Sequence, residues 1–333
     1  MFTRRPALAV RLAVLLAAVV LCPATGLDPH YLASSMAAAR APAAQQPSQS
    51  RIDAERQIRD LQALASPELE GRLTGTPGNR RAQALILDRF KQIGLRPIDG
   101  SYEQTFSFPQ PRRGGRQGLP DATNLMGVVP GTANPQSFIV VSAHYDHLGV
   151  RNGQTYPGAD DNASGVAALL AIAAWFAEHP PGTSLLFVAF DAEEQGLQGS
   201  KHFVANPPVP LERIAAVVNM DMIGRGDANR LFVAGTYHNP ALKPVVSEAA
   251  KASKVVIAFG HDKPTAQASG RDDWTNLSDH GPFHAAGIPF LYFGVEDHPD
   301  YHKPTDTADR IPRRFYQEAT ELVLETVRRM ADR

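Results

Sequence analysis

The chain has 333 residues, one cysteine and a formal net charge of −1, with 33 Lys and Arg against 34 Asp and Glu. Charges of both signs are interspersed, which gives no sign of a nucleic-acid-binding surface, and a single cysteine excludes a framework of intrachain disulfides. Stability therefore has to come from a packed core, and the length suits one large domain.

The first 26 residues have the pattern of a secretory signal peptide. Arg4 and Arg5 precede an apolar stretch interrupted by Arg11, and small residues follow at 24–26. The uninterrupted apolar stretch is shorter than the ~20 residues that a membrane span needs, which argues against a retained anchor. We expect export to the periplasm or the extracellular medium, with no stable membrane insertion after residues 1–26 are removed.

Residues 27–50 are rich in Ala, Pro, Gln and Ser and predict a flexible lead-in. The remaining residues, 51–333, alternate between helix and strand patterns. In chain order we expect helices over 51–65 and 79–93, strands over 102–108, 124–129 and 138–143, a helix over 163–177, strands over 185–190, 214–219 and 231–234, a helix over 241–252, a strand over 288–293 and a helix over 314–330.

This alternation predicts an α/β fold in a single domain over 51–333. The strands are apolar throughout, which is typical of a sheet that is covered on both faces. We expect a three-layer sandwich in which helices flank a central mixed, mostly parallel sheet.

Two adjacent acidic residues, Glu193 and Glu194, follow the predicted strand over 185–190. Neighbouring like charges repel unless a cation lies between them, and ligands of open α/β sheets bind at the carboxyl ends of the strands. The alternative is a solvated turn. Whether other strands place ligands at the same edge decides between these interpretations.

Other strand ends do carry such residues. His144 and Asp146 follow the strand over 138–143, and residues two apart on an extended segment point the same way. Asp146 is thus placed to hold the His144 ring, as carboxylates commonly do for metal-binding imidazoles. Asp221 lies between Met220 and Met222, and a buried carboxylate there has to be paired or metal-bound.

Asp160 and Asp161 enter the buried helix over 163–177, where a single carboxylate would satisfy an ordinary N-cap. A carboxylate at this position is also stabilised by the helix dipole, which suits a rigid bridging ligand.

His298 and His302 follow the last strand and are further ligand candidates, and Tyr301 places a phenol beside His302.

Mixed imidazole and carboxylate donors suit zinc, cobalt or manganese better than calcium or magnesium. If each of the five segments provides one donor, the site has two imidazoles and three carboxylates, which is more than one ion needs. They suit two ions that share a bridging carboxylate and each keep an open position, which is an arrangement used for hydrolysis.

Five motifs carry a family resemblance, namely GADDNASG, DAEEQGLQGS, NMDMIG, SDHGPF and YHKPTDT, in that order. They resemble those of the secreted double-zinc aminopeptidases, whose wider relatives include glutamate carboxypeptidases and glutaminyl cyclases. The resemblance covers about 51–333. It implies a zinc peptidase catalytic domain with two zinc ions per chain that removes N-terminal residues from peptides with a free N-terminus.

The resemblance also implies a role for each matching residue. His144 and Asp221 would hold one zinc, Glu194 and His302 the other, and Asp161 would bridge them. Glu193 matches the general base and Tyr301 a tyrosine that stabilises the oxyanion. Asp146 and Asp160 would support the ligands, with a cis peptide bond expected between Asp160 and Asp161. We expect Asp279 and His280 to be structural, and the resemblance gives His147, His284 and His298 no ligand role.

Other readings stay open on the same fold. A carboxypeptidase or dipeptidase would need a basic group for the substrate carboxylate, for which Arg225 or Arg271 is available. A glutaminyl cyclase would use a single zinc, and a non-catalytic receptor-like relative would have lost ligands or the base. Asp297 and Asp300 are candidates for holding a substrate amine. The oligomeric state cannot be read from the sequence.

Overall fold

The structure is a computed structural model that describes residues 50–109, 121–263 and 272–333. The predicted signal peptide over 1–26 and all but the last residue of the predicted lead-in lie outside the described residues. The described residues, from Ser50 to Arg333, belong to one compact unit. Within the described ranges, none of the helices combines the length and apolar character that crossing a membrane requires.

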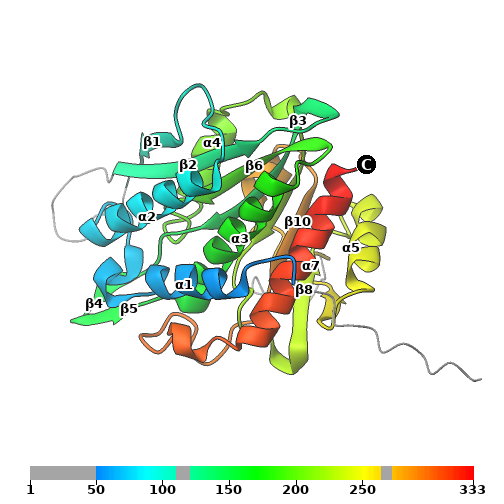
Figure 1. Ribbon diagram of the computed structural model, residues 1–333. Helices are drawn as coiled ribbons and strands as arrows, with labels where there is room; N and C mark the ends of the chain where they lie inside the picture. Colours follow the sequence, from blue (N-terminus) through cyan, green and yellow to red (C-terminus); the bar gives the residue numbers. More distant parts are fainter. Residues whose placement is uncertain (1–49, 110–120, 264–271) are drawn as a thin grey trace, which may run out of the picture. The chain divides into compact units, whose positions relative to one another are not determined.

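An eight-stranded sheet forms the centre of this unit (Figure 1). In spatial order its strands are β1 (Glu103–Ser107), β2 (Asp121–Val129), β6 (Thr183–Phe190), β3 (Asn134–His144), β7 (Ile214–Met220), β10 (Phe290–Gly294), β8 (Arg230–Ala234) and β9 (Val256–Phe259). The four central strands β6, β3, β7 and β10 are parallel, whereas β2 and β8 pair antiparallel with their outer members. The carboxyl ends of the central strands therefore lie along one edge.

Helices cover both faces of the sheet. One face carries α1 (Ala54–Leu64), α2 (Pro77–Ile93), α3 (Gly165–Glu178), α5 (Lys243–Ala250) and α7 (Arg313–Ala331), and Figure 1 shows α1, α2, α3 and α7 on this side. The other face carries α4 (Gln198–Ala205) and α6 (His280–Ala285). Alternate residues of β6 supply the two cores, with Phe187 in the first and Phe190 in the second. The predicted three-layer fold is confirmed.

Local signals explain where the first helices begin and end. The Asp53 side chain accepts a hydrogen bond from the amide of Arg56 and so caps α1. Thr76 caps α2 in the same way and is followed by Pro77, which has no N–H to leave unpaired. Gly94 ends α2 with φ of 85°, a conformation that glycine adopts without strain.

Several short elements were not predicted. These are α4, α6, β9 and the two-stranded hairpin of β4 (Gly149–Arg151) and β5 (Gln154–Tyr156). The helices α4 and α6 have at most eight residues, too few turns for a clear helical period, and tertiary packing decides their conformation. A short π-helical turn (Ala159–Ser164) also precedes α3 and carries the acidic pair of the GADDNASG motif.

Candidate metal centre

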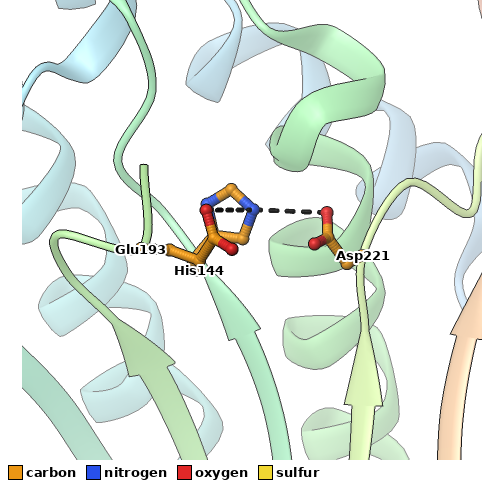
Figure 2. A group of neighbouring side chains, drawn as sticks. All are labelled: His144, Glu193 and Asp221. Atoms are coloured by element: carbon orange, nitrogen blue, oxygen red, sulfur yellow. Dashed lines mark hydrogen bonds and ion pairs between the residues drawn. The ribbon is translucent and has the colours of Figure 1, made fainter. Parts of the chain in front are cut away.

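His144 and Asp221 meet because the strands that carry them are neighbours. His144 is the last residue of β3, Asp221 directly follows β7, and these two strands are paired in parallel. His144 Nε2 lies 3.2 Å from Asp221 Oδ1, and Glu193 Oε2 lies 4.0 Å from the same nitrogen. Figure 2 shows the imidazole with dashed lines to both carboxylates, above the ends of the strands.

A second group of donors lies beside the first. His302 Nε2 is 3.0 Å from Asp161 Oδ2 and 3.5 Å from Glu194 Oε2. The other Asp161 oxygen, Oδ1, lies 3.4 Å from His144 Nε2. We call His144, Asp161 and Asp221 the inner cluster, and Asp161, Glu194 and His302 the outer cluster. Asp161 is common to both and directs one oxygen at each.

The spacing of these donors fits metal ions. Four donors bound tetrahedrally to one zinc-sized ion, at about 2.0–2.2 Å, lie about 3.3–3.6 Å from one another. The contacts within the two clusters run from 3.0 to 3.5 Å. Within the described ranges, two groups of His, Asp and Glu side chains have the spacing of a metal site: His144, Glu193 and Asp221, and His147, Asp161 and Glu194. They overlap the inner and the outer cluster respectively, but they include Glu193 and His147 and leave out His302.

The electrostatics also favour a cation. Burial and the nearby charge of Glu194 raise the pKa of Asp161. Burial likewise raises the pKa of Glu193 well above its ordinary value, although His144 opposes the shift. These carboxyl groups resist ionising together without a cation, and a dication would offset the desolvation and the mutual repulsion that raise their pKa values.

The two remaining carboxylates are stabilised by imidazoles. Burial works against ionisation of Glu194, but hydrogen bonds from His147 and His302 hold its pKa well below the usual range. Burial of Asp221 is similarly outweighed by His144, so that its pKa is lowered. Both groups are therefore carboxylates at neutral pH, as metal ligands have to be.

Tyr301 lies at the mouth of the site, where its ring stacks on His302 with ring centroids 3.9 Å apart. Burial, together with the charges of Asp161 and Asp221, raises the pKa of the phenol well above its ordinary value. The hydroxyl therefore keeps its proton and is available as a hydrogen-bond donor.

Asp146 supports the site in a way that the sequence did not predict. Its carboxylate lies 3.7 Å from His144 Nδ1, beyond hydrogen-bond distance, and the main-chain carbonyl of Asp146 lies closer, at 3.2 Å. The carboxylate oxygens instead accept hydrogen bonds from the amides of Glu193, at 3.0 Å, and Glu194, at 3.3 Å. Asp146 thus fixes the loop that carries the base and one ligand.

Asp160 faces away from the clusters. Its Oδ1 accepts a hydrogen bond from the Gly224 amide at 2.7 Å, and its Oδ2 lies 3.1 Å from His298 Nε2. His298, a ligand candidate from the sequence, is thereby occupied outside the clusters. Asp306, which we had not singled out, accepts hydrogen bonds from the amides of Asp160 and Asp161.

The expectation of a cis bond between Asp160 and Asp161 was wrong by one position. The cis peptide joins Asp161 to Asn162. The Asn162 side chain explains this placement of the backbone, because Nδ2 donates to the Met220 carbonyl while Oδ1 accepts from the Met222 and Gly165 amides. The contacts with Met220 and Met222 bind the turn to the segment that carries Asp221, and the contact with Gly165 binds it to the start of α3.

Sequence reasoning missed Arg72, a fully buried arginine in the connector between α1 and α2. Its guanidinium donates to the carbonyls of Leu64, Tyr145, Pro157 and Gly158, at 2.6 to 2.9 Å. Burial lowers its pKa to about 10, whereas the charges of Asp161 and Asp146 oppose that shift. Arg72 thus joins the loops of both clusters, and an arginine inside a Gly- and Thr-rich connector was the only signal for it.

Asp191 is likewise a structural residue. Its oxygens accept hydrogen bonds from Thr74, Asn79, Tyr145 and the Thr123 amide. Burial raises its pKa to about 7. Asp279 and His280 are buried at the start of α6, and burial raises the pKa of Asp279 to about 7 and lowers that of His280 to about 4.

The clusters line a small cavity of about 100 Å³, which adjoins a larger one of about 540 Å³. The two share Trp274, Leu277, Asp297, Tyr301 and His302. Within the described ranges neither cavity is lined by Lys or Arg, whereas Asp297 lines both. The approach to the clusters is thus acidic.

Two residues considered for substrate charges have other partners. Asp300 accepts hydrogen bonds from Arg225 at 2.8 Å, from Arg310 and from Thr305. Arg225 and Asp300 therefore neutralise each other outside the cavity lining. Arg271, the other basic candidate, lies outside the described residues.

Comparison with known proteins gives a consistent result. A family model described as peptidase family M28 matches residues 124–327, more than half of the chain. Aminopeptidase YwaD of Bacillus subtilis is 32% identical over 214 residues, covering 61% of this chain and 44% of that protein. The chain spans less than half the length of the first curated relatives that it matches.

Solved structures share the fold. A zinc aminopeptidase from Bacillus subtilis, BSAP, superposes with a TM-score of 0.68 at 19% identity and covers 84% of this chain and 96% of its own. The glutaminyl cyclase of Porphyromonas gingivalis gives the same TM-score at 20% identity, with 84% and 98% covered. At such identities the likeness shows the fold alone.

Proposed function

The chain belongs to peptidase family M28, and on that premise we propose that it is a metal-dependent aminopeptidase that uses two zinc ions. One observation carries the proposal. Asp161 directs one oxygen at the inner cluster and the other at the outer cluster, 3.4 Å from His144 and 3.0 Å from His302. That is the position of a ligand shared by two ions. The names of relatives, which include zinc aminopeptidase and probable zinc metalloprotease, support zinc as the metal.

Two zinc ions held by these residues would acidify a water molecule and polarise the carbonyl of the scissile peptide bond. His144 and Asp221 would hold one ion, Glu194 and His302 the other, and Asp161 both. The chain itself has to move the proton, stabilise the developing charge and position the peptide.

Glu193 is the residue that we assign to proton transfer. Its Oε2 lies 4.0 Å from His144 Nε2, farther than the 3.0–3.5 Å contacts within the two clusters, and its raised pKa suits a group that takes and returns a proton. It would accept a proton from the attacking water and then pass it to the nitrogen of the leaving amine. Its neighbour Glu194 remains a ligand, so the adjacent pair divides into a base and a ligand.

Tyr301 is the donor that we assign to the carbonyl oxygen. Its hydroxyl is protonated, and the residue lines the same cavity as Glu193 and His144. A hydrogen bond that strengthens as the carbonyl oxygen becomes negative lowers the barrier more than it tightens substrate binding.

The acidic cavity favours a free N-terminus at the site. A protonated α-amine matches the carboxylates around the cavity, and Asp297 is placed to hold it because it lines both the small and the large cavity. A carboxypeptidase would need a cation there, and Arg225, one of the two candidates, is already paired with Asp300. The donors for a second ion likewise argue against a single-zinc glutaminyl cyclase.

We also propose that the protein is exported, on the strength of residues 1–26 alone. Fractionation of a cell that expresses the full chain would test this. Recovery of the processed protein from periplasm or medium is expected, and retention of the unprocessed chain inside the cell would contradict it.

A substrate panel tests the proposed activity. The full chain is assayed on aminoacyl-p-nitroanilides and on their N-acetylated counterparts, before and after removal of metal by a chelator, and again after zinc is restored. We expect cleavage of only the free-amine substrates, loss of activity with the chelator and recovery with zinc. Cleavage of the N-blocked substrates, or activity that survives metal removal, would contradict the proposal.

A further inference from the structure

We propose that His147 is a positioning residue of the outer cluster, where its Nδ1–H holds Glu194 Oε1 so that only Oε2 is presented to the metal. The inference rests on the proposed metal centre and adds a residue to it. His147 lies three residues after His144, in the loop that leaves β3, and it is fully buried.

The His147 ring is fixed against the turn that carries Asp161. A Cβ atom on Gly158 would lie 2.5 Å from His147 Cδ2, so the ring packs directly on the glycine backbone. Gly158 has φ of 56°, and its carbonyl accepts a hydrogen bond from Arg72. On its other side the ring meets His302 edge-on, with centroids 5.7 Å apart.

Distances distinguish this residue from the ligands. His147 Nδ1 lies 2.6 Å from Glu194 Oε1 and 3.7 Å from Asp161 Oδ2. Two donors on one tetrahedral zinc lie about 3.3–3.6 Å apart, so 2.6 Å is too short for two ligands of the same ion. It is the length of a hydrogen bond to a charged oxygen.

The proton in this contact has to belong to His147. A carboxylate oxygen only accepts hydrogen bonds, so Nδ1 is the donor. The other ring nitrogen, Nε2, is buried and has no hydrogen-bond partner among the described residues. The contact is therefore a hydrogen bond from His147 Nδ1 to Glu194 Oε1.

This hydrogen bond gives the two oxygens of the Glu194 carboxylate different partners. Oε1 faces His147, while Oε2 lies 3.5 Å from His302 Nε2, at the spacing of the other ligands. Glu194 is thereby restricted to one metal-facing oxygen. The outer ion then has three protein donors, with a position left for water or substrate.

A pair of near-isosteric substitutions tests the proposal. In His147→Asn the side-chain amide places an N–H near the former Nδ1, whereas His147→Leu has the same branching and no donor. Both variants and the wild type are stripped of metal and titrated with zinc against a chelating dye, which reads the number of ions bound and the affinity for each.

We expect His147→Leu to weaken one of the two binding steps by about 10–100-fold, as removal of groups that orient ligands typically does. His147→Asn should bind both ions with affinities close to those of the wild type. Equal losses in the two variants would make His147 a direct ligand or a packing residue, and equal retention would make it dispensable. Either result would overturn the proposal.

The test includes a replacement variant, and its outcomes separate a failure of this proposal from a failure of the two-zinc proposal. If His147→Leu does not fold, as judged by circular dichroism, His147→Gln replaces it, because its amide reaches one bond farther and cannot reproduce the Nδ1 donor. A wild-type chain that binds fewer than two ions would refute the two-zinc proposal itself. A wild type that binds two ions, with variants that do not differ, refutes only the role of His147.

Discussion

The inner and outer clusters share Asp161 but are built by different means. The inner cluster is placed by the sheet, because His144 and Asp221 sit at the ends of paired strands, and their side chains are only 1% and 12% exposed. The outer cluster is assembled from loops, and its His302 side chain is 37% exposed. One metal site is therefore positioned by main-chain pairing and the other by side-chain hydrogen bonds.

This difference indicates where each site is sensitive. Changes near the inner cluster should affect chemistry while leaving the fold intact, because the strands hold it. The outer cluster depends on contacts such as His147 with Glu194, Asp146 with the Glu193–Glu194 amides, and Asp306 with the Asp160–Asp161 amides. We expect the outer ion to be the first to leave and the more easily perturbed.

The largest effect is expected beside the inner cluster, from Glu193→Gln. The amide keeps the shape of the side chain but cannot accept the proton of water, so the rate should fall by about 10²–10⁴-fold. Both zinc ions should still bind, since Glu193 is not a ligand. Steady-state assays with zinc analysis check this, and a rate equal to that of the wild type in a two-zinc variant would remove Glu193 from the mechanism.

The next largest effect is expected from Tyr301→Phe. Loss of one donor to a developing oxyanion typically costs about 10²–10³-fold in kcat. The phenylalanine ring can still stack on His302, so zinc binding and KM should change little. Comparison of kcat with KM on one aminoacyl-p-nitroanilide measures this, and an unchanged kcat would contradict the assignment.

A matched pair of ligand variants tests whether the two clusters act separately. Asp221→Ala should lose the inner ion and His302→Ala the outer one, each with an affinity loss of at least about 100-fold, because even residues that merely orient ligands cost 10–100-fold. Each variant should retain one ion. Zinc titration is the readout. Loss of both ions from either variant would show that the clusters form a single site.

The outer ion should bind more tightly as the pH rises. Burial alone would lower the pKa of His302, but hydrogen bonds and charges from Asp161 and Glu194 raise it to about 10 in the metal-free protein. Zinc has to displace that proton, so affinity should rise by up to about tenfold per pH unit below pH 10. Titrations at pH 6.5 and 8.5 measure this, and equal affinities would show that His302 is not protonated there.

The smallest effect on catalysis is expected from Arg72→Lys, because Arg72 joins the loops of both clusters and is not a metal donor. A lysine cannot reach the four carbonyls that the guanidinium contacts, and each unpaired buried carbonyl costs about 1–3 kcal/mol. The free energy of unfolding, from denaturant titration, should fall by at least that amount. The exposed Arg80→Lys is the control, and equal stabilities of the two variants would contradict the role of Arg72.

The sequence predicted most of the fold because its central strands and long helices carry strong periodic signals. The apolar run of β6 and the fully apolar α3 both lie close to their predicted bounds. The inner cluster followed from the same reasoning, since a residue at a strand end has a known position. The six-residue helix α6, which contains Pro282, carried no such signal.

The outer cluster could not be placed by pattern alone. His302 lies in a loop after β10, and only the family resemblance gave it a partner. His147 was given no role, because the hydrogen bond to Glu194 depends on the packing of its ring against Gly158, which no spacing in the sequence encodes. Arg72 was missed for the same reason, because its contacts with four carbonyls also depend on packing that no spacing encodes. It also lies outside residues 124–327, which the family model matches.

Crystals of the zinc-loaded protein, measured at the zinc absorption edge, test the central claim most directly. We predict two anomalous peaks about 3.5–4 Å apart, the separation found in two-metal hydrolases. One should lie beside His144 and Asp221, the other beside Glu194 and His302, with one Asp161 oxygen bound to each. A single peak, or two peaks that Asp161 does not bridge, would contradict the account.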